Sequence, residues 1–512
     1  MKSFKDKKIV IMGLGLHEQG SGGMAAQFFA KQGAKVLVTD LCTRKQLKLA
    51  LERLKKYKNI KYVLGRHREE DFKKADLIFQ NPSVPAYSPY LQIAQKAKIP
   101  IINDWSIFLS RHQPQMFIPP PSQNTSRFIG PSGKVGGFIG VTGTRGKSTT
   151  TALIYEMLKR HHSHIRANVR MRGKDRRVFL AGNLGVSPLS FIDKYQGEPI
   201  VAELSSWLLH HFPTARVSPN IAVVTNIMND HLNKYRTRHE YIADKENIFR
   251  FQNKNDVVVL NYDNSYTQQM AKKAKGKIIW FSTQPFKKQQ EGIFANLTKS
   301  AIVPSMALFV KYKDLQFRWR TEMLIQVSDI RLRGEHNLAN IMAACAVAQV
   351  IGISREDVVA VLKSFNGLPN RLELVREING VKYYNDTTAT TPDATIAALK
   401  TLGTGEEKII LIAGGADKKL EYKELVKYIK RYCKALILLP GTATDKLKLE
   451  IGNWKLEIQE AQSMQEAVVM AKNSAEKGDI ILLSPAAASF GLFKNEFDRG
   501  EQFVEEVGKL RG

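Results

Sequence analysis

The chain has 512 residues, of which 43% are hydrophobic and 24% charged, and its formal net charge is +29. At roughly 150 residues per domain, this length predicts two to four domains. No apolar run approaches about 18 residues, which argues against a membrane-spanning helix, and three scattered cysteines, Cys42, Cys345 and Cys433, argue against a disulfide framework. The charged N-terminus carries no secretion signal, so we expect a cytoplasmic protein.

The large positive charge raises nucleic acids, acidic lipids and polyanionic substrates as partners. The charge is spread along the chain, however, and we find no basic motif interleaved with aromatic residues of the kind that RNA-binding modules use. The densest cluster, residues 161–177, is most simply a solvated loop. We therefore expect neither a membrane nor a nucleic acid as partner.

The first predicted domain, residues 1–112, begins with a strand at 8–12 that runs into a glycine turn. A helix pattern at 24–32 and a second strand ending on Asp40 follow, which together indicate a Rossmann-like unit with an acid where ribose recognition is often placed. Glu18 stands where the dinucleotide fingerprint has its third glycine. A nicotinamide dehydrogenase is therefore possible but not favoured.

Residues 113–137 change abruptly to prolines, serines and glycines, a composition that does not build a core. We interpret this segment as a linker or a surface insertion. It separates the first domain from a central domain predicted at 138–366.

The central domain begins with a strand, a glycine-rich loop at 140–146 and a helix, which is the context of a phosphate-binding loop. Glycines let backbone N–H groups face phosphate oxygens, Lys147 supplies a mobile cation, and Ser148 is a ligand that suits Mg²⁺. Val141 departs from the strict pattern, which has glycine six residues before the lysine. A chance glycine turn is the alternative, which the flanking strand and helix disfavour.

Two further apolar strands of this domain end in metal-ligating side chains. The first of these strands ends at Glu203. The second, at 221–226, is followed by a short segment that contains His231. With Ser148 they would provide oxygen, carboxylate and imidazole beside a nucleotide, although His231 by itself would more often be an ordinary strand-end histidine. Asn337 and Asn340 share one face of a predicted buried helix, where capping explains one asparagine and a bound base would explain two.

The last predicted domain, residues 367–512, begins with a hairpin-like pair of strands joined by the turn signal Asn379-Gly380. Later strands each end in small or polar residues, which indicates a second doubly wound domain. Its loops suit a small charged substrate and the far side of a nucleotide. The fold class predicted for the whole chain is therefore α/β in three domains, with Rossmann-like outer domains and a central P-loop mononucleotide-binding domain.

Seven motifs occur in one order along nearly the whole chain: 143–149, 203–206, 229–231, 334–337, 367–371, 385–387, and 483–489 with 493–495. In these motifs the chain resembles the Mur ligase family, ATP-dependent amino acid ligases that build the peptidoglycan stem peptide. Within that family the chain is most similar to members that add glutamate to UDP-N-acetylmuramoyl-L-alanine. The resemblance implies an acyl-phosphate intermediate, ATP and Mg²⁺ as cofactors, and peptidoglycan precursor synthesis in the cytoplasm. We expect a monomer.

The resemblance also implies roles for individual residues. The residues implied to be catalytic are Lys147, Glu203, His231 and Lys245. Those implied to bind ATP are Gly143, Thr144, Arg145, Gly146, Lys147, Ser148, Thr149, Asn337, Asn340, Arg371 and Asp386. Those implied to face the UDP substrate are Gly15, Leu16, His17, Asp40, Asn81, Asn183 and Ser205. Those implied to surround the amino acid are Thr390, Lys418, Ser489 and Phe490. The implied metal ligands are Ser148, Glu203, His231 and, if carbamylated, Lys245.

Five alternatives stay open at this point. Lys245 could be an unmodified, solvated helix cation. Thr388 stands where many glutamate-adding members have lysine, and Glu496 precedes Phe497 where an aromatic residue usually comes first. The handedness of the glutamate is therefore open, as are an alanine-adding Mur ligase and a folylpolyglutamate synthase. A basic P-loop ATPase that binds nucleic acid is the remote alternative from another class.

Overall fold

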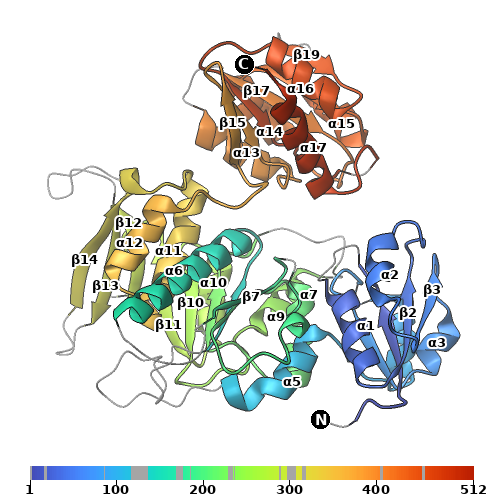
Figure 1. Ribbon diagram of the computed structural model, residues 1–512. Coiled ribbons are helices and arrows are strands. Elements are labelled where there is room, and N and C mark those ends of the chain that lie inside the picture. Colours follow the sequence, from blue (N-terminus) through green and yellow to red (C-terminus); the bar gives the residue numbers. More distant parts are fainter. Residues whose placement is uncertain are drawn as a thin grey trace. The chain divides into compact units, whose positions relative to one another are not determined.

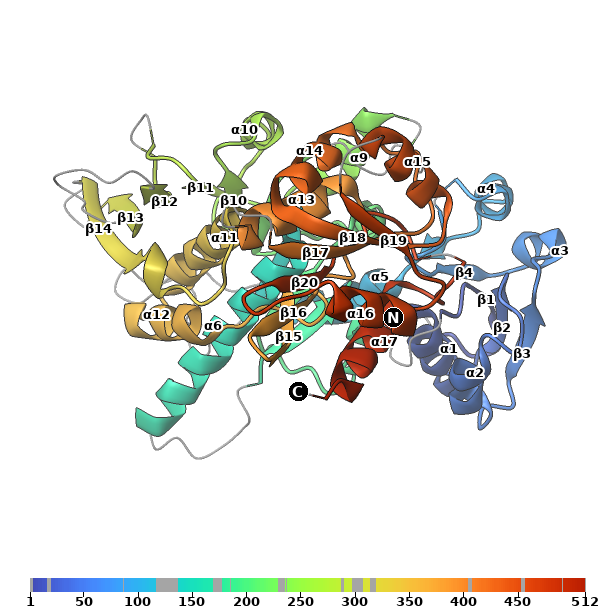
Figure 2. The ribbon, with the colours of Figure 1, turned by 90° about the horizontal axis from the view of Figure 1, so that it is seen from above.

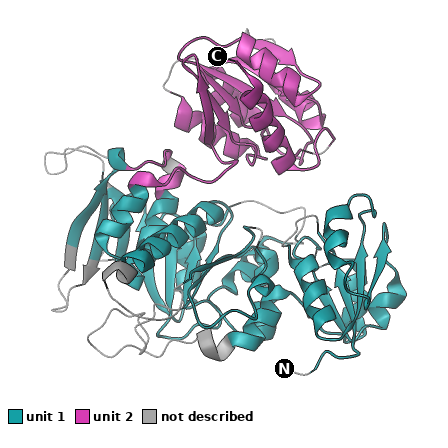
Figure 3. Cartoon of the chain, in the orientation of Figure 1, with its two compact units in different colours: residues 1–329, 339–362 teal, residues 330–338, 363–512 magenta. Residues whose placement is uncertain are grey.

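A computed structural model of the protein describes residues 3–15, 20–85, 87–116, 137–168, 177–184, 186–228, 235, 237–286, 290–296, 307–313, 319–403, 408–452, 456–489 and 491–511. The chain forms two compact units, one of residues 1–329 with 339–362 and the other of residues 330–338 with 363–512 (Figure 3). Among the described residues, every helix falls short of the length and apolarity needed to cross a membrane.

The first sheet lies in the first unit and has the strand order β3-β2-β1-β4-β5, with parallel pairs throughout. It is drawn in blue in Figure 1, where β2 and β3 are labelled. Its strands are β1 (Lys8–Met12), β2 (Lys35–Asp40), β3 (Ile60–Leu64), β4 (Leu77–Gln80) and β5 (Ile101–Ile102). Its helices are α1 (Ser21–Lys31), α2 (Lys48–Leu54), α3 (Glu69–Lys73) and α4 (Pro89–Lys96). Parallel strands are covered on both faces, and the buried apolar run of β1 fits that position. The Rossmann-like prediction is confirmed.

The second sheet of this unit has the order β14-β13-β12-β11-β10-β9-β6-β8-β7. Its strands are β6 (Phe138–Thr142), β7 (Phe179–Gly182), β8 (Ile200–Glu203), β9 (Ile221–Val224), β10 (Val257–Asn261), β11 (Lys277–Ser282), β12 (Gly292–Asn296), β13 (Ala307–Lys313) and β14 (Trp319–Gln326). The strands from β12 to β14 pair antiparallel and extend an otherwise parallel sheet. The phosphate-loop strand β6 therefore lies between β8 and β9, whose ends carry further predicted site residues.

Eight helices described here accompany this sheet: α5 (Asp104–Met116), α6 (Lys147–Asn168), α7 (Ser206–Leu209), α8 (Phe212–Ala215), α9 (Arg238–Glu246), α10 (Ser265–Ala271), α11 (Glu335–Ile351) and α12 (Arg355–Ser364). Helices α6, α11 and α12 lie side by side (Figures 1 and 2). The hydroxyl of Thr150 on α6 donates to the carbonyl of Asn340 on α11 at 3.4 Å, and Arg160 pairs with the buried Asp357 of α12 at 3.2 Å.

The third sheet belongs to the second unit and has the order β15-β16-β20-β17-β18-β19. Its strands are β15 (Glu373–Ile378), β16 (Val381–Asn385), β17 (Ile409–Gly414), β18 (Cys433–Leu439), β19 (Glu457–Glu460) and β20 (Ile480–Leu483). Its helices are α13 (Pro392–Leu402), α14 (Lys423–Tyr432), α15 (Thr442–Ile451), α16 (Met464–Asn473) and α17 (Glu496–Lys509). The predicted hairpin is confirmed: β15 and β16 pair antiparallel, and Asn379 and Gly380 both have positive φ angles.

Helix α5 runs to Met116, four residues into the segment 113–137 that the composition indicated as a linker. Its earlier turns pack against the central sheet, where the Trp105 ring stacks on Phe138 with centroids 5.0 Å apart. This aromatic packing stabilises the helix independently of the proline-rich sequence that follows. The predicted boundaries at 112, 137 and 366 stay predictions.

Candidate active site

The predicted phosphate loop connects β6 to α6, and two of its glycines have backbone conformations that side chains resist. Gly143 has a φ of 145° and Gly146 a φ of 80°. A Cβ atom would lie 1.9 Å from the Thr225 hydroxyl at Gly143 and 2.0 Å from the Asn340 Oδ1 atom at Gly146. Glycine is therefore required at both positions by conformation and by close approach.

Thr225 and Asn226, which directly follow β9, hold this loop in place. The Thr144 amide donates to the Asn226 carbonyl at 2.9 Å, and the Arg145 amide donates to Asn226 Oδ1 at 2.9 Å. The Thr225 hydroxyl donates to the Arg145 carbonyl at 2.5 Å. Sequence reasoning did not select Thr225 and Asn226, although their place directly after an apolar strand of this domain was an available signal.

Lys147 and Ser148 lie in the first turn of α6. The Lys147 ammonium donates to the Thr144 carbonyl at 3.0 Å, which folds the side chain back over the loop. Ser148 is buried. A glycine loop that ends at a helix N-terminus directs N–H groups and a favourable dipole at an anion, so this arrangement can bind phosphate.

Glu203 ends β8, where its backbone pairs with Val141 of the phosphate-loop strand. Its side chain is only 4% exposed, and among the described residues its Oε2 atom has no hydrogen-bond partner. An unpaired carboxylate oxygen is costly to bury. A divalent cation would satisfy it, and oxygen-rich ligands of this kind are what Mg²⁺ prefers.

Of the other predicted metal ligands, the structure describes Ser148 but not His231. Ser148 lies at the N-terminus of α6, while His231 falls outside the described residues. No cluster of three or more His, Cys, Asp or Glu side chains able to hold a metal occurs within the described ranges. The hydroxyl oxygen of Thr142, at the end of β6, is a second buried oxygen that finds no hydrogen-bond partner in the described part of the chain. The oxygens present thus fit Mg²⁺.

Lys245 is brought to the phosphate loop by α9. Its ammonium is buried, with the residue 2% exposed, and donates to the Gly143 carbonyl at 2.8 Å. The same nitrogen lies 4.7 Å from the centre of the Tyr241 ring, and the Tyr241 hydroxyl is 2.9 Å from that of Thr144. The alternative of a solvated helix cation is therefore wrong. Tyr241 was not predicted, because an aromatic residue on a helix face is usually core.

Three residues predicted to face the UDP substrate lie together at the carboxyl edge of the first sheet. One Asp40 oxygen accepts from the Leu14 amide at 2.7 Å and the other from the Cys42 amide at 2.8 Å. The Asn81 side-chain amide donates to the Gly13 carbonyl at 3.2 Å. Gly15 follows in the same turn, so Asp40 and Asn81 shape its glycine loop. Leu16 and His17 fall outside the described residues.

The other two predicted substrate residues flank Glu203. The Asn183 amide donates to the Glu203 carbonyl at 3.0 Å, and the Ser205 hydroxyl accepts from the Leu208 amide at 3.4 Å as the cap of α7. Their side chains therefore belong to the turns on either side of the buried carboxylate. The structure brings both to the edge of the sheet that carries the phosphate loop.

Asn337 and Asn340 both lie on α11 but have different neighbours. Asn340 lies against Gly146 of the phosphate loop, whereas the Asn337 side-chain amide donates to the Arg333 carbonyl at 2.7 Å near the start of the helix. Asn337 belongs to the second compact unit and Asn340 to the first. That both bind a base stays a prediction.

Asp386 follows β16 and is buried in the second unit. Its two oxygens accept from the Leu372 amide at 3.1 Å and from the Ser484 hydroxyl at 2.8 Å. Burial raises the pKa of Asp386 to about 7, against the opposing effect of these hydrogen bonds and of the neighbouring Arg371. At neutral pH this carboxyl is therefore divided between its two protonation states.

The raised pKa of Asp386 gives a testable pH dependence of stability. Since the unfolded pKa of aspartate is about 3.9, the unfolded chain releases this proton first as pH rises, and the contribution of Asp386 to folding falls up to about pH 7. We expect Asp386→Asn to remove this contribution, so that the free energy of unfolding declines less between about pH 5 and pH 8. Denaturant titrations at both pH values measure it, with the exposed Asp393→Asn as control; equal declines in wild type and Asp386→Asn would contradict the assignment.

Three of the four residues predicted around the amino acid lie at one edge of the third sheet. The Lys418 ammonium donates to the Thr390 hydroxyl at 2.8 Å. Ala416 and Ala488 form an antiparallel β-bridge in which each backbone amide donates to the other's carbonyl. The Ala486 amide donates to the Ala389 carbonyl at 2.9 Å. These bonds join the loops that carry Thr390, Lys418 and the buried Ser489, while Phe490 falls outside the described residues.

Arg499 is a buried cation that sequence reasoning missed. It is 0% exposed, and from α17 it donates to the Thr387 hydroxyl at 3.0 Å, the Thr387 carbonyl at 2.8 Å and the Ala487 carbonyl at 3.3 Å. Burial lowers its pKa to about 10. The guanidinium thereby fastens two loops of the candidate amino acid site together. No sequence signal distinguished it from the solvated cations usual on a terminal helix.

Fold and site together define a class: a multidomain α/β protein with a phosphate-binding loop beside a buried carboxylate and a buried lysine. Family models of three domains match the N-terminal, middle and C-terminal parts of the chain in turn. They are the MurD-like N-terminal domain at residues 7–103, the Mur ligase middle domain at 141–348 and the Mur ligase glutamate ligase domain at 370–487. The chain belongs to the Mur ligase family.

Individual relatives match over almost their full length. Proteins named UDP-N-acetylmuramoylalanine--D-glutamate ligase are 37% identical in Roseiflexus sp. (strain RS-1), covering 97% of both chains, and 35% identical in Borreliella afzelii, covering 100% of this chain and 99% of that one. Among solved structures, the UDP-N-acetylmuramate-alanine ligase MurC from Thermotoga maritima has a TM-score of 0.58 at 18% identity, covering 98% and 99%. The MurF ligase from the same organism, in complex with ADP, has a TM-score of 0.52 at 16% identity, covering 99% and 96%. These structural likenesses establish the fold.

Proposed function

We propose that this chain is an ATP-dependent ligase that joins D-glutamate to UDP-N-acetylmuramoyl-L-alanine in peptidoglycan precursor synthesis. The observation that carries this proposal is similarity over the whole length to proteins named for that reaction, at 35–37% identity and with 97–100% of this chain covered. A ligase that used only part of this architecture would not need to match all three domains.

Each of the three sheets supports one part of the substrate set. The edge of the first sheet with Gly15, Asp40 and Asn81 would hold the UDP end. The loop with Lys147 would hold the ATP phosphates, and the edge with Lys418 and its neighbours would hold glutamate. Backbone N–H groups and cations are suited to phosphates, and Lys418 offers a positive charge to a carboxylate.

Ser148 and Glu203 would hold Mg²⁺, together with His231. The buried Glu203 oxygen without a hydrogen-bond partner in the described chain supports this role. When bound, the cation supplies positive charge that neutralises the phosphates. Lys245 already contacts the loop through Gly143, and a carbamate on its nitrogen would convert a buried cation into a further oxygen ligand.

The chain's own residues would lower the barrier at the charged step. An oxygen of the alanyl carboxylate attacks the γ-phosphorus, the bond to ADP breaks, and an acyl phosphate forms. Carboxylate and γ-phosphate repel each other, and Lys147 reduces that repulsion. The glutamate ammonium group releases one proton to solvent, and the resulting amine attacks the acyl carbon. The bond to phosphate then breaks, the nitrogen gives a second proton to solvent or phosphate, and the amide forms.

Purified protein with ATP, Mg²⁺ and UDP-N-acetylmuramoyl-L-alanine tests the proposal against a panel of amino acids. We expect phosphate release and a product of the corresponding mass with D-glutamate. The matched reaction with UDP-N-acetylmuramate and L-alanine is expected to release none. A product with L-glutamate instead would reverse the handedness, and no product with any amino acid would overturn the proposal.

A further inference from the structure

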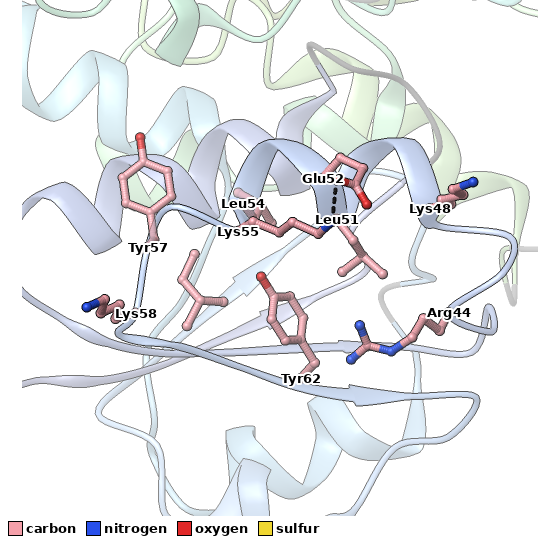
Figure 4. A pocket seen from close by; sticks show the side chains of 10 residues that line it. Arg44, Lys48, Leu51, Glu52, Leu54, Lys55, Tyr57, Lys58 and Tyr62 are labelled. Carbon is pink, nitrogen blue, oxygen red and sulfur yellow. Dashed lines mark ion pairs between the residues drawn. The ribbon is translucent and has the colours of Figure 1, made fainter.

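A groove in the first unit is lined by residues none of which is a predicted site residue. Its volume is about 470 Å³, and its walls come from the loop after β2, helix α2, the turn that follows, and strand β3 (Figure 4). We call it the α2–β3 groove. Strand β2 separates β3 from β1, so the groove is also distinct from the glycine turn that follows β1.

The floor of the α2–β3 groove is apolar. Leu51, Leu54 and Ile60 line it with buried side chains. Tyr57 and Tyr62 stand above them, each half-buried, and in Figure 4 both rings rise beside the floor. An occupant therefore gains from placing an apolar side chain between the two rings.

Cations stand at both ends of this floor. Lys58 lies at one end, and Arg44 and Lys48 lie at the other, as Figure 4 shows. Within the described residues, no carboxylate forms an ion pair with any of these three. The single acidic residue of the groove, Glu52, is paired with Lys55. Residues 44–61 contain eight lysines and arginines and one acidic residue. Four cations and one carboxylate line the groove, so its lining carries a net positive charge.

The open side of the groove is a sheet edge. Strand β3 pairs only with β2 in the described sheet, in parallel register, so alternate backbone N–H and C=O groups of β3 face outward. Ile60 and Tyr62 are two residues apart and share the face toward α2. An extended peptide added along this edge would direct alternate side chains into the groove.

We propose that the α2–β3 groove binds an extended acidic segment of a partner protein, added to β3 as a further strand. The segment has the pattern acid-x-apolar-x-acid, with the apolar side chain on the floor and the acids at the two cationic ends. The proposal is independent of the proposed function. A membrane surface fits less well because the apolar atoms lie at the bottom of a concavity. A nucleic acid fits less well because its backbone lacks the alternating N–H donors and C=O acceptors that pair with a strand edge.

Binding is measured by fluorescence anisotropy of a labelled peptide with the core Glu-Thr-Val-Thr-Glu, using the full-length protein. We expect saturable binding that weakens with salt, and none to the matched core Lys-Thr-Val-Thr-Lys. Two versions of the acidic peptide, each N-methylated at alternate residues, separate strand addition from plain charge attraction. One version has its methyl groups toward β3 and should lose binding, while the other should keep it.

Charge-reversal variants test whether the peptide binds at the α2–β3 groove. We expect Lys48→Glu with Lys58→Glu to weaken binding about tenfold or more. The control Lys31→Glu with Lys74→Glu has the same charge change on exposed lysines of the same sheet domain and should change affinity little. Ligase activity should be unaffected in both, so a failure of the proposed function and a failure of this proposal are separate results.

Any one of three binding results would overturn the proposal. The first is that the two double variants weaken peptide binding equally, and the second is that the two N-methylated peptides have equal effects. The third uses a labelled oligothymidylate and phosphatidylglycerol vesicles as competing probes. Binding of either probe that is as tight as peptide binding, and is weakened as much by Lys48→Glu with Lys58→Glu, would contradict a peptide site. Amide hydrogen exchange adds a direct check. Slower exchange in residues 60–64 on addition of the acidic peptide supports strand addition, and unchanged exchange opposes it.

Discussion

Glu203→Gln is expected to reduce phosphate release by about a thousandfold or more without destabilising the fold. Glutamine keeps the shape of the side chain but removes the negative charge that would hold Mg²⁺. The carboxylate is buried with one oxygen that has no hydrogen-bond partner in the described chain. Because glutamine has the same size and the oxygen it replaces makes no hydrogen bond within the described chain, we expect the melting temperature to change little.

The measurement for Glu203 combines steady-state kinetics with thermal unfolding, each at several Mg²⁺ concentrations. Glu356→Gln is the control, because Glu356 is exposed on α12 of the same unit. Wild-type stability should rise on addition of Mg²⁺ with ATP, and that rise should be smaller in Glu203→Gln. Wild-type activity in the variant, or a melting temperature that falls together with activity, would contradict a ligand role.

Lys147→Ala is expected to lower turnover by a similar factor, about a thousandfold, and to weaken ATP binding. The Lys147 ammonium already lies over the loop, 3.0 Å from the Thr144 carbonyl, where it can reach the phosphates. Alanine keeps the helix, since it is the best helix former. The loss should therefore be chemical rather than structural.

Lys147→Arg is the informative comparison, because it keeps the charge but replaces a compact ammonium with a planar guanidinium. We expect partial activity at most, with ATP binding weakened less than in Lys147→Ala. Titration calorimetry with ATP and kinetics with D-glutamate separate the two effects. Full activity of Lys147→Ala would refute the phosphate site.

Most of the fold could be predicted from local sequence signals. Asn379-Gly380 predicted a hairpin because few residues tolerate the positive φ angles of such turns. The phosphate loop was predictable because Gly143 and Gly146 are needed by conformation as well as by close approach. The extension of α5 to Met116 was not predictable from composition, because its stability comes from Trp105 packing on a distant strand.

The polar interior of the site was harder to predict. Lys245 and Arg499 are cations on helices, and their burial depends on which loops the fold brings against them. Thr225 and Asn226 act through bonds to Arg145 of the loop, 80 and 81 residues earlier in the chain. Such contacts leave no periodic pattern, so the resemblance identified Lys245 while nothing identified Arg499.

The most direct test of the account follows one oxygen atom. UDP-N-acetylmuramoyl-L-alanine labelled with ¹⁸O in both carboxylate oxygens is incubated with the protein, ATP, Mg²⁺ and D-glutamate, and the released phosphate is analysed by mass spectrometry. If the carboxylate is activated as an acyl phosphate, each phosphate carries one ¹⁸O atom and the amide product retains the other. Unlabelled phosphate formed together with the amide product would contradict activation through an acyl phosphate.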